Sequence, residues 1–168
     1  STETGNPPSK FAEVYARARA LGLHTVAHAG EEAPSAYIRE ALDVLRVERI
    51  DHGVTCVDDA ALVRRLAAEQ VPLTMCPLSN VRLRAVSSVE EHPAVRLLDA
   101  GVRVSIHSDD PAYFGGYVEA NFTALVQAHG LDADQVATLA ANGVTSSFAS
   151  PERQQELLDQ IAAWRRPL

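Results

Sequence analysis

The chain has 168 residues, of which 46% are hydrophobic, 22% charged and 5% aromatic. This balance excludes a disordered or collagen-like chain and is typical of one soluble globular domain. The 15 Lys and Arg residues against 22 Asp and Glu residues give a formal net charge of −7. Because a nucleic acid and an anionic membrane would both repel such a surface, the charge favours a small molecule or a protein as the partner.

Cysteine usage and the lack of targeting signals predict a cytoplasmic protein. The two cysteines, Cys56 and Cys76, are too few for a disulfide framework, and we interpret them as reduced thiols. No apolar run approaches the roughly 20 residues that cross a bilayer, and the polar N-terminal segment lacks a signal-peptide core. The single methionine is Met75, so we interpret the chain as processed or as a piece of a longer protein.

Short apolar runs alternate with amphipathic stretches along the whole chain. The expected strands lie at 24–28, 49–54, 71–75 and 102–106. The expected helices cover 7–21, 36–44, 59–69, 93–100, 117–129, 133–142 and 151–164, and a long polar loop is expected at 76–91. Strands that alternate with helices imply an α/β fold with parallel strands and right-handed crossovers.

Polar residues follow each of the four predicted strands. His28 with Glu31 follows the first, His52 the second, the segment 76–80 the third, and Asp109 with Asp110 the fourth. In parallel α/β folds, and above all in barrels, the carboxyl ends of the strands are where active sites are built. Four separate segments that bring polar side chains to one edge therefore predict a functional site there.

Each of these residues also has a purely structural interpretation. His28 can bind a metal through a neutral ring nitrogen, with Glu31 as a proton carrier, but the pair also fits a polar turn. His52 fits either a site histidine or a hydrogen-bonded turn histidine. The adjacent Asp109 and Asp110 repel each other and suit a site where one meets a cation, although an Asp before proline also caps helices.

Four nearby residues receive supporting roles. On a strand, His107 and Asp109 would face the same side, and we interpret His107 as a packing or supporting residue. Cys76 is interpreted as structural, whereas Ser79 and Asn80 are candidate polar groups of a ligand pocket.

Four motifs together resemble the adenosine/adenine deaminase family of metal-dependent amidohydrolases. They occur in the family's order over nearly the whole chain: HAGEE at 28–32, RIDHGV at 49–54, MCPLSNV at 75–81 and SDDPAYFGGY at 108–117. The wording of the last two motifs, and GNPPSKF at 5–11, is more similar to the adenine deaminase branch than to the adenosine branch.

The resemblance implies a (β/α)8 TIM barrel that holds one Zn²⁺ ion and hydrolyses adenine to hypoxanthine and ammonia. It implies His28 and Asp109 as metal ligands, Glu31 as the proton donor to the purine ring, and His52 as the residue that orients the attacking water. Asp110 would bind the purine substrate. Alternative substrates are adenosine and an N6-substituted adenine, and a different metal hydrolase on the same barrel is a further alternative.

The sequence departs from the family pattern in two respects. The family's first barrel strand carries a His-x-His pair, and no such pair is present here. A barrel needs eight strands and about 250 residues, whereas four strands are predicted. We therefore expect residues 1–168 to be a single partial domain: the C-terminal half of the barrel, strands five to eight with their helices, and a C-terminal helical extension.

A half-barrel has consequences for activity and for association. Two ligands are fewer than the three protein ligands of an ordinary catalytic zinc site, so we expect the isolated chain to be inactive. Its open sheet edges predict pairing with the missing half or self-association. The competing hypothesis is a non-catalytic half-barrel that serves as a binding module.

Overall fold

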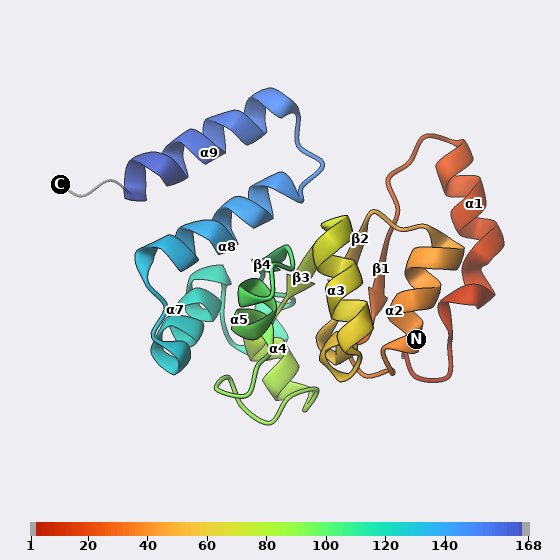
Figure 1. Ribbon diagram of the computed structural model, residues 1–168, viewed down its shortest axis with the longest axis horizontal. Coiled ribbons are helices and arrows are strands. Elements are labelled where there is room, and N and C mark those ends of the chain that lie inside the picture. The colour runs from red at the N-terminus through yellow and green to blue at the C-terminus, as the bar shows by residue number, and fades with distance from the viewer. Residues whose placement is uncertain (1–2, 166–168) are drawn as a thin grey trace. The chain divides into compact units, whose positions relative to one another are not determined.

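Strands and helices alternate along the chain in the computed structural model, which describes residues 3–165 (Figure 1). The strands are β1 (Val26–Ala29), β2 (Arg49–His52), β3 (Leu73–Met75) and β4 (Val104–Ile106). The helical segments are η1 (Pro8–Phe11), α1 (Ala12–Ala20), α2 (Ala36–Glu40), η2 (Ala41–Leu45), η3 (Val54–Asp58), α3 (Ala60–Glu69), α4 (Pro77–Arg82), α5 (Ala94–Asp99), α6 (Pro111–Phe114), α7 (Val118–His129), α8 (Ala133–Thr145) and α9 (Pro151–Arg165). These elements form two compact units, which we call unit 1 (residues 3–75 and 93–103) and unit 2 (residues 76–92 and 104–165).

Unit 1 is built on three parallel strands. Strand β1 pairs with β2 from Val26 opposite Arg49 to Ala29 opposite His52, and β2 pairs with β3. The helical segments α2 and η2 connect the first pair, and α3 connects the second, as parallel pairing requires. The largest fully buried side chains of this unit are all apolar: Ile38, Leu45, Ile50, Leu62, Leu66, Leu73, Met75, Leu97 and Val102.

The expected start of α3 is confirmed, and Asp59 is its cap. One carboxylate oxygen of Asp59 accepts hydrogen bonds from the backbone N–H groups of Ala61 and Leu62, both at 3.0 Å. The other oxygen accepts from Arg39, whose guanidinium holds the pKa of Asp59 below its ordinary value. The cap thus satisfies two of the donors that a helix N-terminus leaves without intrahelical partners.

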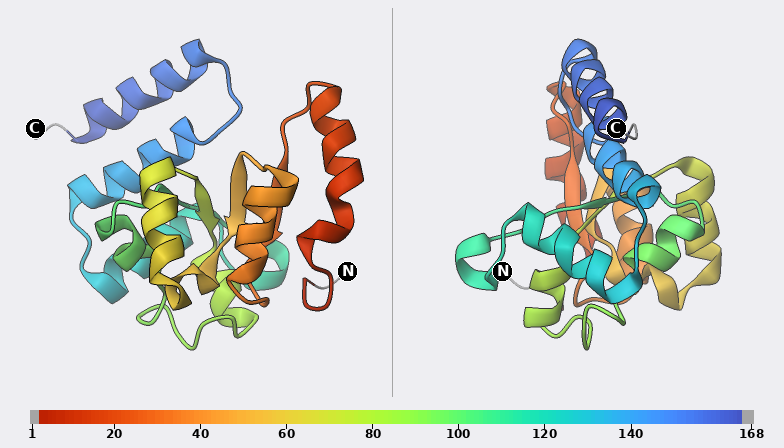
Figure 2. Two further views of the ribbon diagram at one scale, coloured as in Figure 1. Left: turned by 45° about the vertical axis from the view of Figure 1, so that its right-hand side comes forward. Right: turned by 90° about the vertical axis from the view of Figure 1, so that its left-hand side faces the viewer.

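Unit 2 is mostly helical. Helix α8 packs against β4 and against α9, and the two helices run side by side in each view (Figures 1 and 2). Asn142 of α8 donates a hydrogen bond to the carbonyl of Val104 at 2.9 Å, which joins the helix to the strand. A capping box formed by Asp132 and Gln135 begins α8.

One segment of unit 2 differs from the prediction. Residues 77–82, which were expected within a long polar loop, form helix α4. Pro77 occupies the first turn, where its missing N–H costs nothing. The buried amide of Asn121 on α7 accepts a hydrogen bond from the Leu78 N–H at 3.0 Å. Tertiary contacts of this kind override the weak helix propensity of a Pro-Leu-Ser-Asn sequence.

Over residues 3–165, no helix is long and apolar enough to cross a bilayer. The expectation of a single partial domain stays a prediction.

Candidate active site

Three of the predicted site residues lie together in unit 1. The imidazole rings of His28 and His52 have centroids 4.9 Å apart. Nδ1 of His52 lies 3.3 Å from a carboxylate oxygen of Glu31, close enough for a proton to pass between the two groups with little movement. The His52 side chain is only 3% exposed and that of Glu31 13%, whereas that of His28 is 64% exposed. The cluster therefore combines two shielded proton-carrying groups with an imidazole that is open to a ligand.

The carboxylate of Asp51 lies beside the imidazole of His28. Its carboxylate lies 3.7 Å from Nδ1 of His28 and accepts hydrogen bonds from Thr74 at 2.8 Å and Arg49 at 3.3 Å. Burial raises the pKa of the Tyr15 hydroxyl above its ordinary value, and the negative charge of Asp51 raises it further. A carboxylate beside one ring nitrogen of a histidine is the usual arrangement around a metal ligand, because it fixes the ring and leaves the other nitrogen to the metal.

The loop that carries Glu31 begins with a glycine that the fold requires. Gly30 has φ +74°, and a Cβ atom there would lie 2.5 Å from Cδ1 of Ile38 and 2.8 Å from Oγ1 of Thr55. Both the backbone conformation and the lack of space exclude a larger residue. The HAGEE sequence thus has a structural need for its glycine.

Two candidate residues, one in each unit, hold a left-handed backbone. His52 has φ +68° and Asp109 has φ +54°. The other non-glycine residues with positive φ follow helices, where such a conformation is common: Arg46, Gln70 and Arg84. At His52, the last residue of a strand, and at Asp109, shortly after one, the conformation costs about 1–3 kcal/mol. Strain of this kind collects at functional sites.

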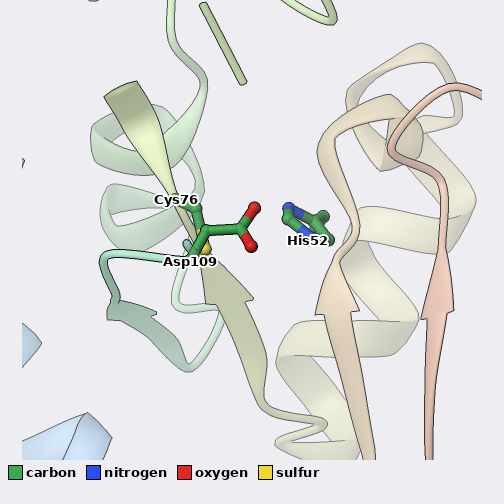
Figure 3. A group of neighbouring side chains, drawn as sticks. All are labelled: His52, Cys76 and Asp109. Atoms are coloured by element: carbon green, nitrogen blue, oxygen red, sulfur yellow. The ribbon is translucent and has the colours of Figure 1, made fainter. Parts of the chain in front are cut away.

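In unit 2, Asp109 is held by a hydroxyl group. The side chain of Ser79, which is fully buried at the start of α4, donates a 2.6 Å hydrogen bond to Oδ2 of Asp109. The Asp109 carboxylate also lies beside the thiol of Cys76, within 4.8 Å (Figure 3). Asp110 is exposed at the start of α6, and its side chain makes no capping hydrogen bond. Of the two adjacent acids, one is therefore anchored and the other is available to a ligand.

Other expectations for unit 2 have mixed outcomes. Asn80 is fully buried, but its side chain is engaged by His92 at 3.2 Å. The argument that His107 and Asp109 share one face of a strand is wrong, because β4 ends at Ile106. His107 instead lies 2.8 Å from the hydroxyl of Ser105.

Sequence reasoning missed two residues that hold the Glu31 loop. The Glu3 carboxylate binds the loop's backbone N–H groups, and Thr55 binds its carbonyl groups. Neither residue belongs to a motif with chemical meaning, and both are more than 20 positions away from the loop along the chain. No local signal in the sequence could have found them.

The donor set fits a zinc ion in part. The exposed imidazole of His28, with Asp51 beside its Nδ1, and the Asp109 carboxylate, with one oxygen bound by Ser79, are nitrogen and oxygen ligands of the kinds that zinc binds in proteins. A catalytic zinc site has three protein ligands, so neither residue forms such a site by itself.

Polar residues at the carboxyl ends of parallel strands are typical of α/β enzymes, whose active sites lie at that end of the sheet. The sequence profile of the adenosine deaminase family matches residues 1–164, and the chain belongs to this family. It is 56% identical over 161 residues to the adenine deaminase of Cupriavidus taiwanensis, an alignment that covers 96% of this chain and 46% of that protein. The chain thus spans about half the length of the curated relatives that it matches.

Solved structures give the same result for the fold. The crystal structure of adenine deaminase from Arthrobacter aurescens is 58% identical, with a TM-score of 0.96, and the match covers 98% of this chain and 50% of that one. An amidohydrolase of Burkholderia ambifaria with bound Zn is 27% identical with a TM-score of 0.82, and the match covers 97% and 49% of the two chains. These matches confirm the predicted family and the predicted class of fold: four strands with helices, similar to about half of each matched chain.

Proposed function

We propose that the complete protein is a zinc-dependent adenine deaminase, which converts adenine and water to hypoxanthine and ammonia. The observation that carries this proposal is the cluster of His28, Glu31 and His52, in which a shielded carboxyl group lies 3.3 Å from a buried imidazole. The similarity to adenine deaminases over nearly the whole chain supports adenine as the substrate. The relatives are about twice as long, so the activity is that of a complete enzyme and not of these residues alone.

The chain's own residues divide the work of the reaction. Water must add to the carbon that bears the amino group, and the ring nitrogen beside that carbon must accept the displaced electrons. Glu31 donates a proton to this nitrogen, and His52 takes a proton from the attacking water. The bond from the carbon to the amino group then breaks: the amino group takes the proton from His52 and leaves as ammonia, and the hydroxyl proton of the adduct returns to Glu31. Asp110, exposed and without a capping role, hydrogen-bonds the five-membered ring of the purine. General acid–base catalysis of this kind contributes on the order of 10²–10⁴-fold to the rate.

His28 and Asp109 would hold the zinc ion, with the remaining ligands from segments outside this chain. Zinc, when bound, supplies a Lewis acid that lowers the pKa of water from 15.7 to around 7. Asp51 and Ser79 would support the two ligands. Asp51 lies beside Nδ1 of His28, which leaves Nε2 to the metal, and Ser79 binds Oδ2 of Asp109, which leaves the other carboxylate oxygen to it.

The test is an assay of the complete protein with adenine, adenosine and N6-methyladenine, in which kcat/KM is measured for each substrate and zinc content is determined. We expect adenine to be preferred. Glu31→Gln, which keeps the shape of the side chain, should lower kcat by a factor on the order of 10²–10⁴. Glu32→Gln, the exposed neighbour, is the matched control and should leave kcat unchanged. An active Glu31→Gln enzyme would refute the assignment of the proton donor.

The isolated chain is proposed to be inactive and to need the other half of the barrel as its partner. Among residues 3–165, β1 pairs with β2 alone and its other edge is open to a strand from elsewhere. Turnover by the purified chain with added zinc, at a rate comparable to that of the complete enzyme, would contradict this proposal. Cys56 and Cys76, which are buried and form no disulfide, support the cytoplasm as the compartment.

A further inference from the structure

The side chain of Glu3 is bound by four consecutive backbone N–H groups. One carboxylate oxygen accepts from Gly30, and the other accepts from Glu31 at 3.1 Å, Glu32 at 2.9 Å and Ala33 at 3.0 Å. The donors lie 27 to 30 residues after Glu3 along the chain. All five residues belong to unit 1, and the loop follows directly after β1.

Successive N–H groups that converge on one point form an anion-binding concavity of the backbone, and here an internal carboxylate fills it. The loop lies outside the strands and helices, so without Glu3 these N–H groups would lose their hydrogen-bond acceptor, although Gly30 and Ala33 are buried. Hydrogen bonds to an ionised acceptor are shorter and roughly twice as strong as neutral ones. Four of them on one carboxylate fix the path of the loop more firmly than water could.

The carbonyl side of the same loop is held by Thr55. Its backbone N–H donates to the carbonyl of Gly30 at 2.8 Å, and its hydroxyl donates to the carbonyl of Ala33 at 2.9 Å. Both ends of the segment 30–33 are therefore also held through their carbonyl groups. Glu31 is carried by this segment, and its own N–H is one of the four groups bound by Glu3.

We propose that Glu3 is a positioning residue for the deaminase reaction: by binding the N–H groups of residues 30–33, it holds the carboxyl group of Glu31 where it donates its proton. This inference rests on the proposed function. Glu3 contacts backbone groups and not the reacting atoms, so its loss should act on kcat through the placement of Glu31. A displacement of about 1 Å in a catalytic group can cost roughly 100-fold in rate.

The experiment compares Glu3→Gln with Glu13→Gln, an exposed glutamate on α1. Glutamine has the same shape as glutamate, but one of its two terminal groups donates and cannot accept from an N–H. Two experiments are done on the complete protein: amide hydrogen exchange of residues 30–33 is followed, and kcat and KM for adenine are determined. For Glu3→Gln we expect exchange of these amides to be faster by on the order of tenfold, since a charged hydrogen-bond acceptor is lost. We expect kcat to fall roughly 10- to 100-fold with little change in KM.

The outcomes separate this inference from the proposed function. Faster exchange together with a lower kcat and an unchanged KM supports the role of Glu3, provided that Glu13→Gln behaves as the parent protein. Unchanged exchange, or faster exchange with an unchanged kcat, refutes it while the proposed function stands. A parent protein that deaminates no 6-aminopurine refutes the proposed function and the catalytic role of Glu3 with it. A variant that fails to fold would be replaced by Glu3→Asp, which keeps both acceptor oxygens on a shorter side chain. Its kcat should lie between those of Glu3→Gln and the parent protein, and a kcat no higher than that of Glu3→Gln refutes the inference.

Discussion

In unit 1 the candidate catalytic residues contact one another, whereas in unit 2 the candidate metal ligand depends on one hydroxyl group. His28, Glu31 and His52 form a connected cluster. The loop that carries Glu31 is held by hydrogen bonds to the Glu3 carboxylate and to the Thr55 hydroxyl. The carboxylate of Asp109 accepts a hydrogen bond from Ser79, and its backbone is strained. The difference teaches that proton transfer needs several groups held at fixed distances, whereas a metal ligand needs only one free oxygen pointing in a fixed direction.

The comparison extends to the two thiols, one in each unit, where the largest effect is expected. Burial, with a further contribution from Asp58, raises the pKa of the Cys56 thiol from 9.0 to about 12. A raised pKa keeps the thiol protonated, so at pH 8 the reactive thiolate is about a thousandfold rarer than in an exposed cysteine. In the Cys76→Ser variant, we expect a thiol reagent to modify Cys56 at least that much more slowly in the folded chain than in denaturant.

In the reciprocal variant, Cys56→Ser, the thiol reagent reports on Cys76 of unit 2. Cys76 is 5% exposed, whereas Cys56 is fully buried. We expect Cys76 to become reactive at a lower urea concentration, because unit 2 has one short strand and a helix, α9, without buried residues. Equal midpoints for the two thiols would show that the units unfold together and would break the comparison.

The second prediction tests how tightly the Glu31 loop is packed. Gly30→Ala should lower the free energy of unfolding by roughly 2–5 kcal/mol, because it adds a clash with Ile38 to the cost of a left-handed alanine. Gly22→Ala in unit 1 and Gly130→Ala in unit 2 are matched controls, since both glycines have positive φ and open space around them. Each control should cost about 1–2 kcal/mol in urea unfolding. Three equal values would mean that the loop yields to the added methyl group.

The third prediction concerns the Ser79 hydroxyl, which binds the carboxylate of Asp109. Ser79→Ala in the complete protein should weaken zinc binding by about 10- to 100-fold, because the ligand loses the partner that orients it. The measurement is competition for zinc with a chromophoric chelator. Ser87→Ala, an exposed serine in the loop after α4, is the control and should leave zinc binding unchanged. An unchanged affinity in Ser79→Ala would show that the backbone at Asp109 orients the carboxylate by itself.

The sequence by itself determined the alternation of strands and helices, the family, and the identity of the residues after each strand. These features follow from periodicity and from motifs, which depend on near neighbours in the chain. The cap at Asp59 was predictable for the same reason. Helix α4 was not, because its sequence favours a loop and its stability comes from Asn121 and Asp109, which lie 30 or more positions away.

Only the tertiary structure decided how the site residues are held. It brought the carboxylate of Glu3 to four N–H groups, set Asp51 beside His28, and placed His52 and Asp109 in a left-handed backbone. Each of these arrangements joins segments that are distant in sequence or is sustained by packing around a strained residue. A pattern of neighbouring residues carries no information about such contacts, because they form only when the whole fold brings donor and acceptor together.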